Sequence, residues 1–548
     1  MEIKDLRVLI LSAGQIDDEL AKIFGKIPSG LIPINGKPVI FRIIDKLLDE
    51  GIMKISITVG YKKEVLEEII CEQYKNQCEL EFIPTDHHQP PGNSIKTSMK
   101  NCKEEKLLII LGDTLIDNNL IDLINKAKNF VLTSEKFSDT KNWCVITKKD
   151  EKIDEIFDKK QLYDDKKYYA LVGCYFFNNV NLLKTVLDEF LDEDRLEISS
   201  IIEKIKKTEE FESVNAQKWL DVGHLENYFL TKQFVLKTRY FNKLQFDELG
   251  ENVIKTSTNN EKLIDEINWY KTIPKEISDL VPNISDSSTA DNPFIKLEYI
   301  KHPTLSELWL YGEFSSDFWK GVIKNLFDII QRFRKQNKQV TIEQYNSIYF
   351  KKTLNRIDEL IEISDLFKRI FDEDFVIINH KKLKNWKLMK DEIKEKINNM
   401  FNEEDNCLIH GDLYFSNILY DSENMVFKLI DPRGKWGDST SGDIKYDVAK
   451  IRHSIVGGFD TITNGLYSAR YLDVNEIEYK VFKSKDNQLV GQELDDNIKK
   501  NWKLDEIKMI EGLLFISMLP LHSDNLERQL AFFCIGIERL NEIFGNKN

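Results

Sequence analysis

The sequence predicts an α/β protein whose two parts have different architectures. In the first part, apolar strand-like runs alternate with segments whose apolar residues recur at helical spacing, which is typical of a doubly wound parallel sheet. In the second part, a short strand-rich stretch precedes a long, mostly helical one. A chain of 548 residues also exceeds the size that one hydrophobic core supports, so at least two domains are expected.

The first part extends to about residue 235. Its predicted elements are, in chain order, a strand at 7–11, a helix at 38–51, a strand at 54–60, a helix at 62–75, and strands at 78–83 and 106–113. Ligands of doubly wound sheets bind at the carboxyl ends of the strands. The loops after the first strand and after the 106–113 strand are therefore the expected binding site.

The second part follows a helix predicted over 225–237. Residues 236–302 are expected to form a small lobe of short strands around one helix at 261–273, and residues 303–548 a large helical lobe. The polar stretches 255–262 and 284–292 are predicted to be loops, because clusters of Ser, Thr, Asn and Asp are typical of loops.

Composition excludes several classes of function. The 77 Lys and Arg residues against 92 Asp and Glu give a net charge of −15 and form no dense basic block, which argues against nucleic-acid binding. No apolar run approaches the ~18 residues of a membrane span, and the N-terminus lacks the features of a secretory signal, so no membrane insertion is expected. Seven scattered cysteines without a C-x-x-C pair favour a reduced, cytoplasmic protein.

The stretch LIHGDLYFSNILYDSENMVFKLIDPRG, residues 408–434, places polar side chains beside apolar strand runs. Asp412 lies in a loop after one strand, Asn417 precedes a second, and a hairpin returns Asp431 beside Asn417. Such Asp and Asn oxygens suit Mg²⁺, which takes few protein ligands alongside nucleotide phosphates. A further Asp that is free of metal can accept a proton from a hydroxyl nucleophile.

The pattern H-G-D-x-x-x-x-N followed by I-D resembles that of small-molecule kinases of the protein-kinase-like type, the aminoglycoside phosphotransferases and choline or ethanolamine kinases. The resemblance implies a bilobal α+β domain over 236–548. It also implies that Asp412 is the catalytic base, that Asn417 and Asp431 hold the metal, and that His410 braces the loop.

The same resemblance implies a Lys–Glu pair in the small lobe, with Lys255 at the end of a strand and Glu266 on the next helix. Lys255 would contact the nucleotide phosphates, and residues 294–300 would form the hinge strand that reads the adenine ring. The loop FDELGEN at 246–252 departs from the family, because it has one Gly and no G-x-G-x-x-G motif.

Downstream, the segment SGDIKYDVAKIRHS also resembles these kinases, and there Asp447 is implied to brace the catalytic loop. Four basic residues nearby are candidates for contact with an anionic or polar substrate, with a solvated role as the alternative for each. They are Arg433, Lys435, Arg452 and His453.

In the first part, Ser-Ala-Gly after the first strand leads into PSGLIPINGKP at 28–38, which resembles the signature of sugar-phosphate and choline-phosphate nucleotidyltransferases. Later segments agree in order: PPGNSIKTS at 90–98, LGDT with Asp113, LVGCYFF at 171–177 and WLDVGHLENY with Asp221. The resemblance implies a Rossmann-like doubly wound domain over 1–235 in which backbone amides cradle phosphates and two aspartates converge on Mg²⁺.

The implied contacts fall into three groups. The nucleotide would meet Ser12, Ala13, Gly14, Gly30, Gly92, Asn93 and Ser94. The metal ligands would be Asp113 and Asp221, and the phosphorylated substrate would meet Gly173 and Glu197.

Two basic side chains that the family carries are missing from this signature. Gly14 is followed by Gln15 where the family carries Arg, and Ser29 stands where the family carries Lys. Lys26 and Lys37 are candidate substitutes. A degenerate domain that only binds or scaffolds is therefore an alternative to an active transferase.

Together the two resemblances imply a bifunctional enzyme. It would phosphorylate a small alcohol, amino alcohol or sugar with ATP, then transfer a cytidylyl group from CTP to the phosphomonoester, giving a CDP-activated product for capsule or another cell-surface polysaccharide. One alternative is a sugar kinase joined to a sugar-1-phosphate uridylyl- or guanylyltransferase. Another is a regulatory or scaffolding protein with one inactive domain. The sequence does not distinguish the substrates or the oligomeric state.

Overall fold

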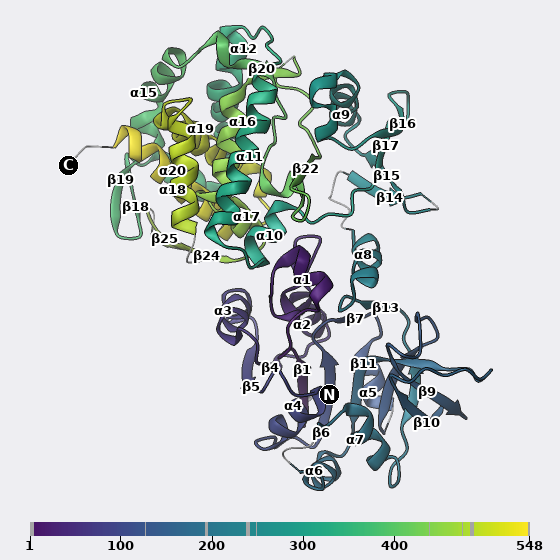
Figure 1. Cartoon of the computed structure of the whole chain (residues 1–548). Coiled ribbons are helices and arrows are strands. Elements are labelled where there is room, and N and C mark those ends of the chain that lie inside the picture. Colours follow the sequence, from purple (N-terminus) through teal and green to yellow (C-terminus); the bar gives the residue numbers. More distant parts are fainter. Residues whose placement is uncertain are drawn as a thin grey trace. The chain divides into compact units, whose positions relative to one another are not determined.

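The computed structural model describes residues 5–126, 128–191, 195–236, 242–247, 249–437, 439–473, 475–482 and 487–545. The chain divides into two compact units (Figure 1). Unit 1 comprises Met1–Val235 and Tyr311–Glu313, and unit 2 comprises Leu236–Leu310 and Phe314–Asn548. Among the described residues, no helix combines the length and the apolar character needed to span a membrane.

Unit 1 is built on a nine-stranded sheet of order β5-β4-β1-β6-β11-β8-β12-β10-β9. Its strands are β1 (Leu6–Leu11), β4 (Lys54–Val59), β5 (Glu79–Pro84), β6 (Lys106–Leu111), β8 (Phe130–Ser134), β9 (Cys144–Lys149), β10 (Lys152–Asp158), β11 (Tyr169–Phe177) and β12 (Glu212–Asn215). The strands predicted at 7–11, 54–60, 78–83 and 106–113 are confirmed to within a few residues.

The sheet is mixed, so the prediction of a parallel sheet is wrong beyond β6. β5, β4, β1 and β6 are parallel, but β11 runs antiparallel to both β6 and β8. β11 misleads because eight of its nine residues are buried, and a continuous apolar run resembles a parallel core strand. Its direction depends on the preceding connection, which includes the β9–β10 hairpin.

The order of the parallel strands creates a switch point between β1 and β6. β1 pairs with β4 on one side and with β6 on the other, with Leu11 opposite Leu111. Ligands of open α/β sheets bind in the crevice outside the carboxyl ends of two such strands. The residues that follow these ends are Ser12 and Gly112, so the two loops singled out in the sequence lie at the same edge of the sheet.

Helices follow the strands of unit 1. They are α1 (Asp18–Phe24), α2 (Val39–Asp49), α3 (Lys63–Tyr74), α4 (Pro91–Met99), α5 (Leu120–Lys126), α6 (Val180–Asp188), α7 (Ile198–Ile205) and α8 (Leu225–Phe234). The helices predicted at 38–51 and 62–75 are confirmed. The end of the helix predicted over 225–237 lies outside the described residues, because residue 237 is not among them.

Unit 2 begins with a four-stranded antiparallel sheet of order β14-β15-β17-β16 and one helix, α9 (Asn260–Thr272). The strands are β14 (Asn242–Phe246), β15 (Asn252–Ser257), β16 (Ile284–Ser288) and β17 (Phe294–Glu298). β16 falls in a stretch predicted to be a loop. It is the edge strand, where polar residues are tolerated because one side faces no neighbouring strand. In the loop FDELGEN, Glu248 lies outside the described residues.

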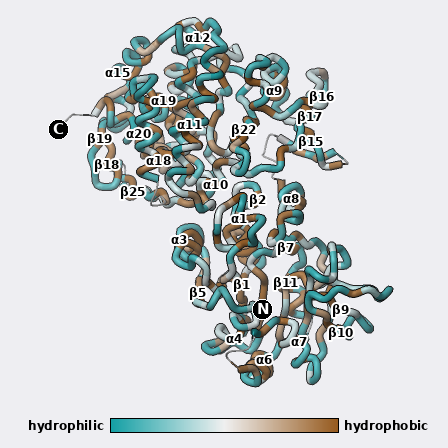
Figure 2. Tube along the Cα trace, viewed as in Figure 1, coloured by the Kyte–Doolittle hydropathy of each residue, from teal (hydrophilic) through white to brown (hydrophobic). Residues whose placement is uncertain are grey.

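The rest of unit 2 is mainly helical, with α10 (Leu305–Tyr311), α11 (Ser316–Arg334), α13 (Lys352–Ile363), α15 (Trp386–Asn399), α16 (Ile444–Ile455), α18 (Asn487–Lys499), α19 (Leu504–Ser517) and α20 (Leu526–Phe544) among its helices. A second four-stranded sheet, not predicted from sequence, has the order β19-β18-β25-β24. Its strands are β18 (Phe375–Ile378), β19 (Lys381–Lys384), β24 (Tyr467–Asp473) and β25 (Glu476–Val481). In both units hydrophobic and hydrophilic segments alternate along the chain (Figure 2).

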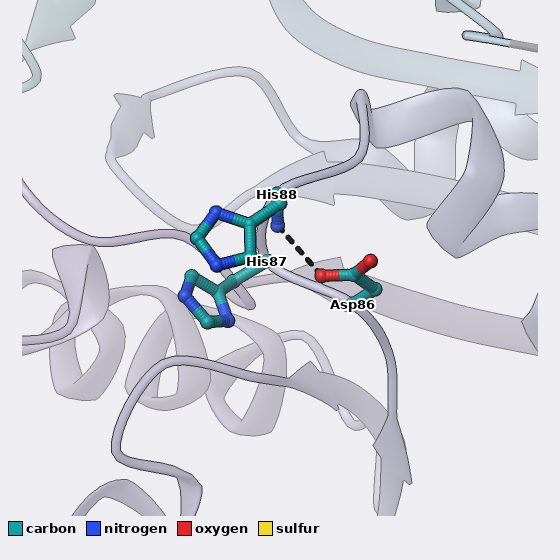
Figure 3. A group of neighbouring side chains, drawn as sticks. All are labelled: Asp86, His87 and His88. Atoms are coloured by element: carbon teal, nitrogen blue, oxygen red, sulfur yellow. Dashed lines mark hydrogen bonds between the residues drawn. The ribbon is translucent and has the colours of Figure 1, made fainter.

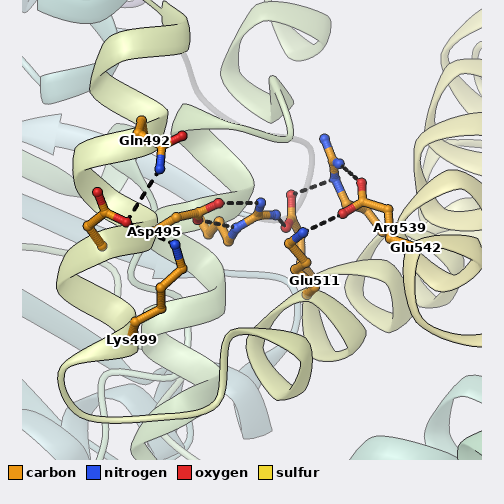
Figure 4. A network of polar contacts seen from close by, with 9 residues as sticks. Gln492, Asp495, Lys499, Glu511, Arg539 and Glu542 are labelled. Carbon is orange, nitrogen blue, oxygen red and sulfur yellow. Dashed lines mark hydrogen bonds and ion pairs between the residues drawn. The ribbon is translucent and has the colours of Figure 1, made fainter.

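A buried ion network joins the helices of unit 2. Arg452 of α16 is bound bidentately by Asp495, with Nε–Oδ1 2.8 Å and Nη2–Oδ2 3.1 Å. Its Nη1 donates to Glu511, which also lies near Arg539 (Figure 4). Of the four basic candidates for substrate contact, Arg452 is thus committed to the core. His453 is also buried, and its ring centroid lies 4.3 Å from that of Phe459 and 4.1 Å from that of Phe515.

Replacement of Arg452 is expected to destabilise unit 2. Arg452→Met leaves the fully buried Glu511 without its main counter-ion, and breaking a buried pair costs about 3–5 kcal/mol of unfolding free energy. Urea unfolding measures the change. The matched control is Arg470→Met, because Arg470 is 72% exposed and pairs with Glu478 at the surface. Equal effects of the two changes would contradict a structural role for the buried network.

Candidate active sites

The loop that carries Asp412 is fixed by one buried carboxylate. It follows β20 (Asn406–Leu408), and Asp447 of α16 accepts hydrogen bonds from the amides of His410 and Gly411, both at 2.8 Å. Burial raises the pKa of Asp447 to about 7, although the two amides oppose this shift. Asp447 therefore acts by holding the backbone of the loop in place. Its carboxylate is buried and is not presented at the surface.

His410 braces the same loop through its side chain. Its Nε2 lies 3.0 Å from the carbonyl oxygen of Ile430, and the amide of Asp412 donates to its Nδ1 at 3.3 Å. Burial lowers the pKa of His410 to about 4, so the ring is neutral at physiological pH. A neutral ring can donate with one nitrogen and accept with the other, which is the arrangement these two contacts require.

Asn417 lies beside Asp412 and opposite the strand that leads to Asp431. Its Nδ2 donates to the backbone carbonyl oxygen of Asp412 at 3.0 Å. Its backbone carbonyl oxygen accepts from the amide of Ile430, also at 3.0 Å. In the described part of the chain, the buried Oδ1 of Asn417 has no hydrogen-bond partner. The free amide oxygen and the Asp431 carboxylate form a hard oxygen set that fits Mg²⁺.

Lys255 and Glu266 form a buried pair that reaches Asp431. The Lys255 Nζ lies 2.8 and 2.7 Å from the two carboxylate oxygens of Glu266 and 2.8 Å from Asp431 Oδ1. Burial raises the pKa of Glu266 to about 7, against the effect of the Lys255 ammonium. Burial alone would lower the pKa of Lys255, but the two carboxylates raise it overall, so Lys255 remains charged. The structure thus brings all three residues together.

Asp412 has its own cation. Lys450 of α16 places its Nζ 2.9 Å from Asp412 Oδ1. Although burial opposes ionisation, Lys450 keeps the pKa of Asp412 below its ordinary value, so Asp412 is a carboxylate at neutral pH. Lys450 could not be selected from local patterns, because it lies 38 residues after Asp412 and its role depends on the packing of α16 against the loop.

Gly434 allows the segment after Asp431 to pack closely against α9. Its φ is +80°, and a Cβ placed there would lie 2.5 Å from the carbonyl carbon of Asp265 and the amide nitrogen of Glu266. Real Cβ atoms do not approach backbone so closely, so a side chain at this position must displace α9. The absence of a side chain therefore allows the segment after Asp431 to lie directly on the helix that carries Glu266.

In unit 1, strand pairing brings Asp113 and Asp221 together. β7 (Thr114–Ile116) pairs antiparallel with β13 (Trp219–Asp221), with Thr114 opposite Asp221. A Cβ at Gly223 would lie 3.1 Å from Asp113 Oδ2 and 3.5 Å from Asp221 Oδ1, so both carboxylates border the same point. Burial and the charge of Asp221 raise the pKa of Asp113 to about 6.

Two side chains orient Asp221. Its Oδ2 accepts from Asn227 Nδ2 at 2.8 Å and lies 2.9 Å from His224 Nδ1, and the hydrogen bond to Asp221 raises the pKa of His224. Sequence reasoning missed His224, although its place three residues after Asp221 was the available signal. Two neighbouring carboxylates, one with a raised pKa, are a donor set that fits Mg²⁺.

The loop after β1 divides into packing residues and free amides. Ser12 is buried, its amide donates to Thr58 Oγ1 at 3.1 Å, and a Cβ at Gly30 would lie 2.4 Å from its Oγ. Ser12 and Gly30, both predicted to bind nucleotide, are therefore packed against each other. Within the described residues, no hydrogen bond uses the amides of Ala13 or Gly14, and a Cβ at Gly14 would meet nothing within 4 Å.

The segment at 90–98 is tied to the residue before Glu197. A Cβ at Gly92 would lie 2.3 Å from the carbonyl oxygen of Leu196, and Asn93 Oδ1 accepts from the Leu196 amide at 2.9 Å. Ser94 donates to Thr85 Oγ1 at 3.2 Å. Gly92 is thus a close-packing glycine. Asn93 and Ser94 line a pocket of about 340 Å³ together with Thr85, Asp86, Gln89, Lys96, Thr97 and Lys100.

Asp86, which lines this pocket, is followed in the same loop by His87 and His88 (Figure 3). Asp86 Oδ1 accepts from the amide of His88 at 2.9 Å, and the two imidazole ring centroids are 3.9 Å apart. The carboxylate therefore stabilises the local turn, and the two rings lie in contact with their planes tilted by 39°.

On the substrate side, Gly173 and Glu197 are placed by different constraints. Gly173 has φ +84° within β11, and a Cβ there would lie 2.9 Å from the Leu111 side chain. Glu197 precedes α7 and is partly exposed, and burial together with the charge of Asp158 raises its pKa. Asp158, which sequence reasoning missed, accepts from Ser199 Oγ at 2.6 Å.

The predicted substitutes for the missing cations have different positions. Lys37 forms an ion pair with Asp45 of α2. It therefore stabilises the helix that follows the turn in which it lies. Lys26 is exposed. The pairing of Lys37 weakens the hypothesis that it replaces a triphosphate-binding cation.

Residues 9–238 match the family model of nucleotidyl transferases. The N-terminal part of the chain therefore has the α/β nucleotidyltransferase fold. The matched residues include Asp113, Asp221 and the loop after β1.

Curated relatives match the same part. A UTP–glucose-1-phosphate uridylyltransferase, AglF, of Haloferax volcanii is 22% identical over 40% of this chain and 93% of its own length. A D-glycero-α-D-manno-heptose 1-phosphate guanylyltransferase of Campylobacter jejuni is 24% identical over 40% of this chain and 96% of its own length. The bifunctional protein GlmU of Methanococcus aeolicus is 26% identical over 39% of this chain. The match spans about half of that relative's own length, 51%. A crystal structure of a putative glucose-1-phosphate thymidylyltransferase from Bacillus anthracis is 18% identical, with a TM-score of 0.38, over 43% of this chain and 97% of its own.

A methyl group at position 434 is expected to loosen α9. In Gly434→Ala, the Cβ overlaps the backbone at Asp265 and Glu266, so amide hydrogen exchange across α9 should become faster. Exchange followed by mass spectrometry measures this.

The matched control is Gly437→Ala. Gly437 also has positive φ, +64°, but a Cβ there would meet only the Gln344 side chain, at 3.9 Å. If both variants change exchange in α9 equally, the close approach of Gly434 to that helix is not what holds it.

Proposed function

We propose that the chain is a bifunctional enzyme. Unit 1 transfers a nucleotidyl group from a nucleoside triphosphate to a sugar phosphate, and unit 2 phosphorylates a hydroxyl group of a small molecule with ATP. The observation that carries the proposal is that each unit brings a pair of oxygen ligands to strand ends, two carboxylates in unit 1 and an Asp–Asn pair in unit 2, beside groups able to hold phosphates. A kinase also makes the phosphomonoester that a nucleotidyltransferase consumes.

In unit 1, the chemistry needs a divalent ion and a phosphate cradle. Asp113 and Asp221 would hold Mg²⁺, which when bound neutralises charge on the triphosphate. The amides of Ala13 and Gly14 are positioned to donate to phosphate oxygens, since no other group in the described chain uses them. The phosphate oxygen of the acceptor attacks the α-phosphorus, and pyrophosphate leaves.

The names of the relatives favour sugar 1-phosphates over choline phosphate as acceptors. They specify uridylyl transfer to glucose 1-phosphate and guanylyl transfer to a heptose 1-phosphate. The cytidylyl specificity expected from sequence has no counterpart among those names, so UTP and GTP belong beside CTP in any assay. An activated sugar for cell-surface polysaccharide, made in the cytoplasm, remains the product we propose.

In unit 2, the roles follow from the contacts around Asp412. Asp412 accepts the proton of the acceptor hydroxyl, Lys255 contacts the ATP phosphates and Glu266 holds Lys255 in place. Asn417 and Asp431 would hold Mg²⁺, which when bound would neutralise charge on the ATP phosphates. His410 and Asp447 keep the loop rigid and act through the backbone.

A second candidate function for unit 1 is binding without catalysis. It is favoured by Gln15 and Ser29, which replace the two expected cations, and by the pairing of Lys37 with Asp45. Pyrophosphate release decides between the two, because a binding domain releases none.

Two substitutions should separate the activities. Asp412→Asn removes the proton acceptor and should lower kcat/KM for ADP release by at least about 100-fold, with pyrophosphate release unchanged. Full-length protein is assayed with ATP and a panel of hydroxyl compounds. The control is Asp421→Asn, at the end of β21 (Ile418–Asp421), where the carboxylate accepts hydrogen bonds from Asn424.

Asp113→Asn should have the reverse effect. Loss of one metal ligand removes several kcal/mol of charge stabilisation and should lower pyrophosphate release more than about 100-fold, with ADP release unchanged. The exposed Asp117→Asn serves as the control. Loss of both activities from either active-site change would argue against two independent sites, and ADP release without pyrophosphate release would favour the binding-only alternative for unit 1.

A further inference from the structure

Three cations converge beside Asp412, from three separate segments of unit 2. Lys352 at the start of α13 donates to the Tyr446 hydroxyl at 3.2 Å, and Arg433 Nη1 donates to the same oxygen at 3.1 Å. Lys450, one helical turn after Tyr446 on α16, binds Asp412. The Arg433 side chain also lies against Gly411 of the catalytic loop, where an added Cβ would be 2.9 Å from Arg433 Cβ.

The charges of this cluster are unbalanced. Lys450 is paired with Asp412, but within the described ranges neither Lys352 nor Arg433 has a carboxylate within ion-pair distance. Both are partly buried, and the phenol between them, Tyr446, is 2% exposed. Partly buried charges are normally paired, so two cations that share one neutral hydroxyl leave room for an anion.

The ionisation of the cluster is consistent with a positive local potential. Burial together with Arg433 and Lys450 lowers the pKa of Lys352 to about 8, against the opposing effect of Tyr446. Burial would raise the pKa of Tyr446, but Lys352, Arg433 and Lys450 lower it to about 8. An anion at this place would stabilise all three cations.

The aromatic rings nearby do not form a cage for a cationic substrate. The Lys352 Nζ lies 5.5 Å from the Tyr446 ring centroid, and the Lys450 Nζ lies 5.6 Å from that of Tyr414. Trp436 is 1% exposed and packs in the core. Because a lysine ammonium already lies over each of these two rings, a quaternary ammonium or amine would meet repulsion where cation–π attraction is needed.

We infer that the molecule phosphorylated in unit 2 carries a carboxylate or phosphate, which binds Lys352 and Arg433 while its hydroxyl faces Asp412. The inference rests on the proposed kinase function and narrows its substrate to an anionic sugar or polyol. It excludes choline, ethanolamine and amino sugars as preferred acceptors. It also assigns a role to one of the four basic residues noted in the sequence, Arg433.

The reaction balances without a further reagent. The acceptor oxygen forms a bond to the γ-phosphorus of ATP as the bond from that phosphorus to the ADP oxygen breaks. The hydroxyl proton passes to Asp412, and the anionic group of the acceptor is unchanged. Lys352 and Arg433 position the acceptor, and they touch neither the transferred phosphorus nor the proton.

A panel of matched acceptors tests the inference with the full chain. Glucose, glucosamine, glucuronate and glucose 6-phosphate form one series, and glycerol, ethanolamine, glycerate and glycerol 3-phosphate form a second. ADP release gives kcat/KM, and calorimetry with a non-hydrolysable ATP analogue gives binding. The anionic members should exceed their neutral analogue in kcat/KM and in affinity at least about tenfold, because their anionic group gains charge-assisted hydrogen bonds from Lys352 and Arg433. The amines should be the poorest.

Variants then locate the effect. Arg433→Gln and Lys352→Gln should each raise KM for the best anionic acceptor about tenfold or more, with KM for ATP unchanged. Arg433→Lys should restore part of the loss. Lys351→Gln is the matched control, because Lys351 is exposed and the change removes the same charge one residue from Lys352.

The outcomes separate this inference from the function on which it rests. Equal or better binding and turnover of the neutral or amine compounds overturns the inference and leaves the kinase proposal intact. An anion preference that persists in both Gln variants also overturns it. Absence of ATP binding and of ADP release with every compound sinks the kinase proposal itself.

Discussion

Two hydrogen bonds from adjacent amides to the buried carboxylate of Asp447 position most of unit 2's chemistry. They fix the backbone of His410 and Gly411, which sets the direction in which Asp412 leaves the loop. His410 then contacts Ile430, in the segment that leads from the strand to Asp431. Asn417 completes this hydrogen-bond network. Its side chain donates to the carbonyl oxygen of Asp412, and its backbone carbonyl accepts from the amide of Ile430. Each polar group therefore depends on a backbone that one side chain from α16 holds.

Unit 1 reaches a similar result by another route. There, antiparallel pairing of β7 with β13 sets Asp221 beside the residue that follows Asp113, and Asn227 and His224 orient the second carboxylate. Both units thus place acidic side chains at strand ends, where the backbone is rigid and the side chains border open space. The difference lies in what holds them, because unit 1 relies on strand register and unit 2 on a helix-borne carboxylate.

Local patterns predicted most elements of unit 1 and the motif residues of both sites, since strand runs and helical periodicity are properties of neighbouring residues. The antiparallel direction of β11, the sheet of β18, β19, β24 and β25, and the polar edge strand β16 were not predictable, because they depend on pairing between distant segments. The same limit applies to side chains. Lys450 of α16 binds Asp412, and Tyr446 of the same helix accepts from Lys352 of α13, so these contacts depend on how the helices pack. Ser12, Gly30 and Gly92 pack closely against other residues, which a motif cannot distinguish from ligand contact.

The contact of Gly434 with α9 has a consequence for sequence drift. No charged group of the site need change for its geometry to fail, because one added methyl displaces the helix that carries Glu266. Selection for the Lys255–Glu266 pair is therefore also selection for a glycine that takes no part in any chemistry. In chains descended from a common ancestor with this one, the residue at this position should report whether the pair is still in use, even where both charged residues are retained.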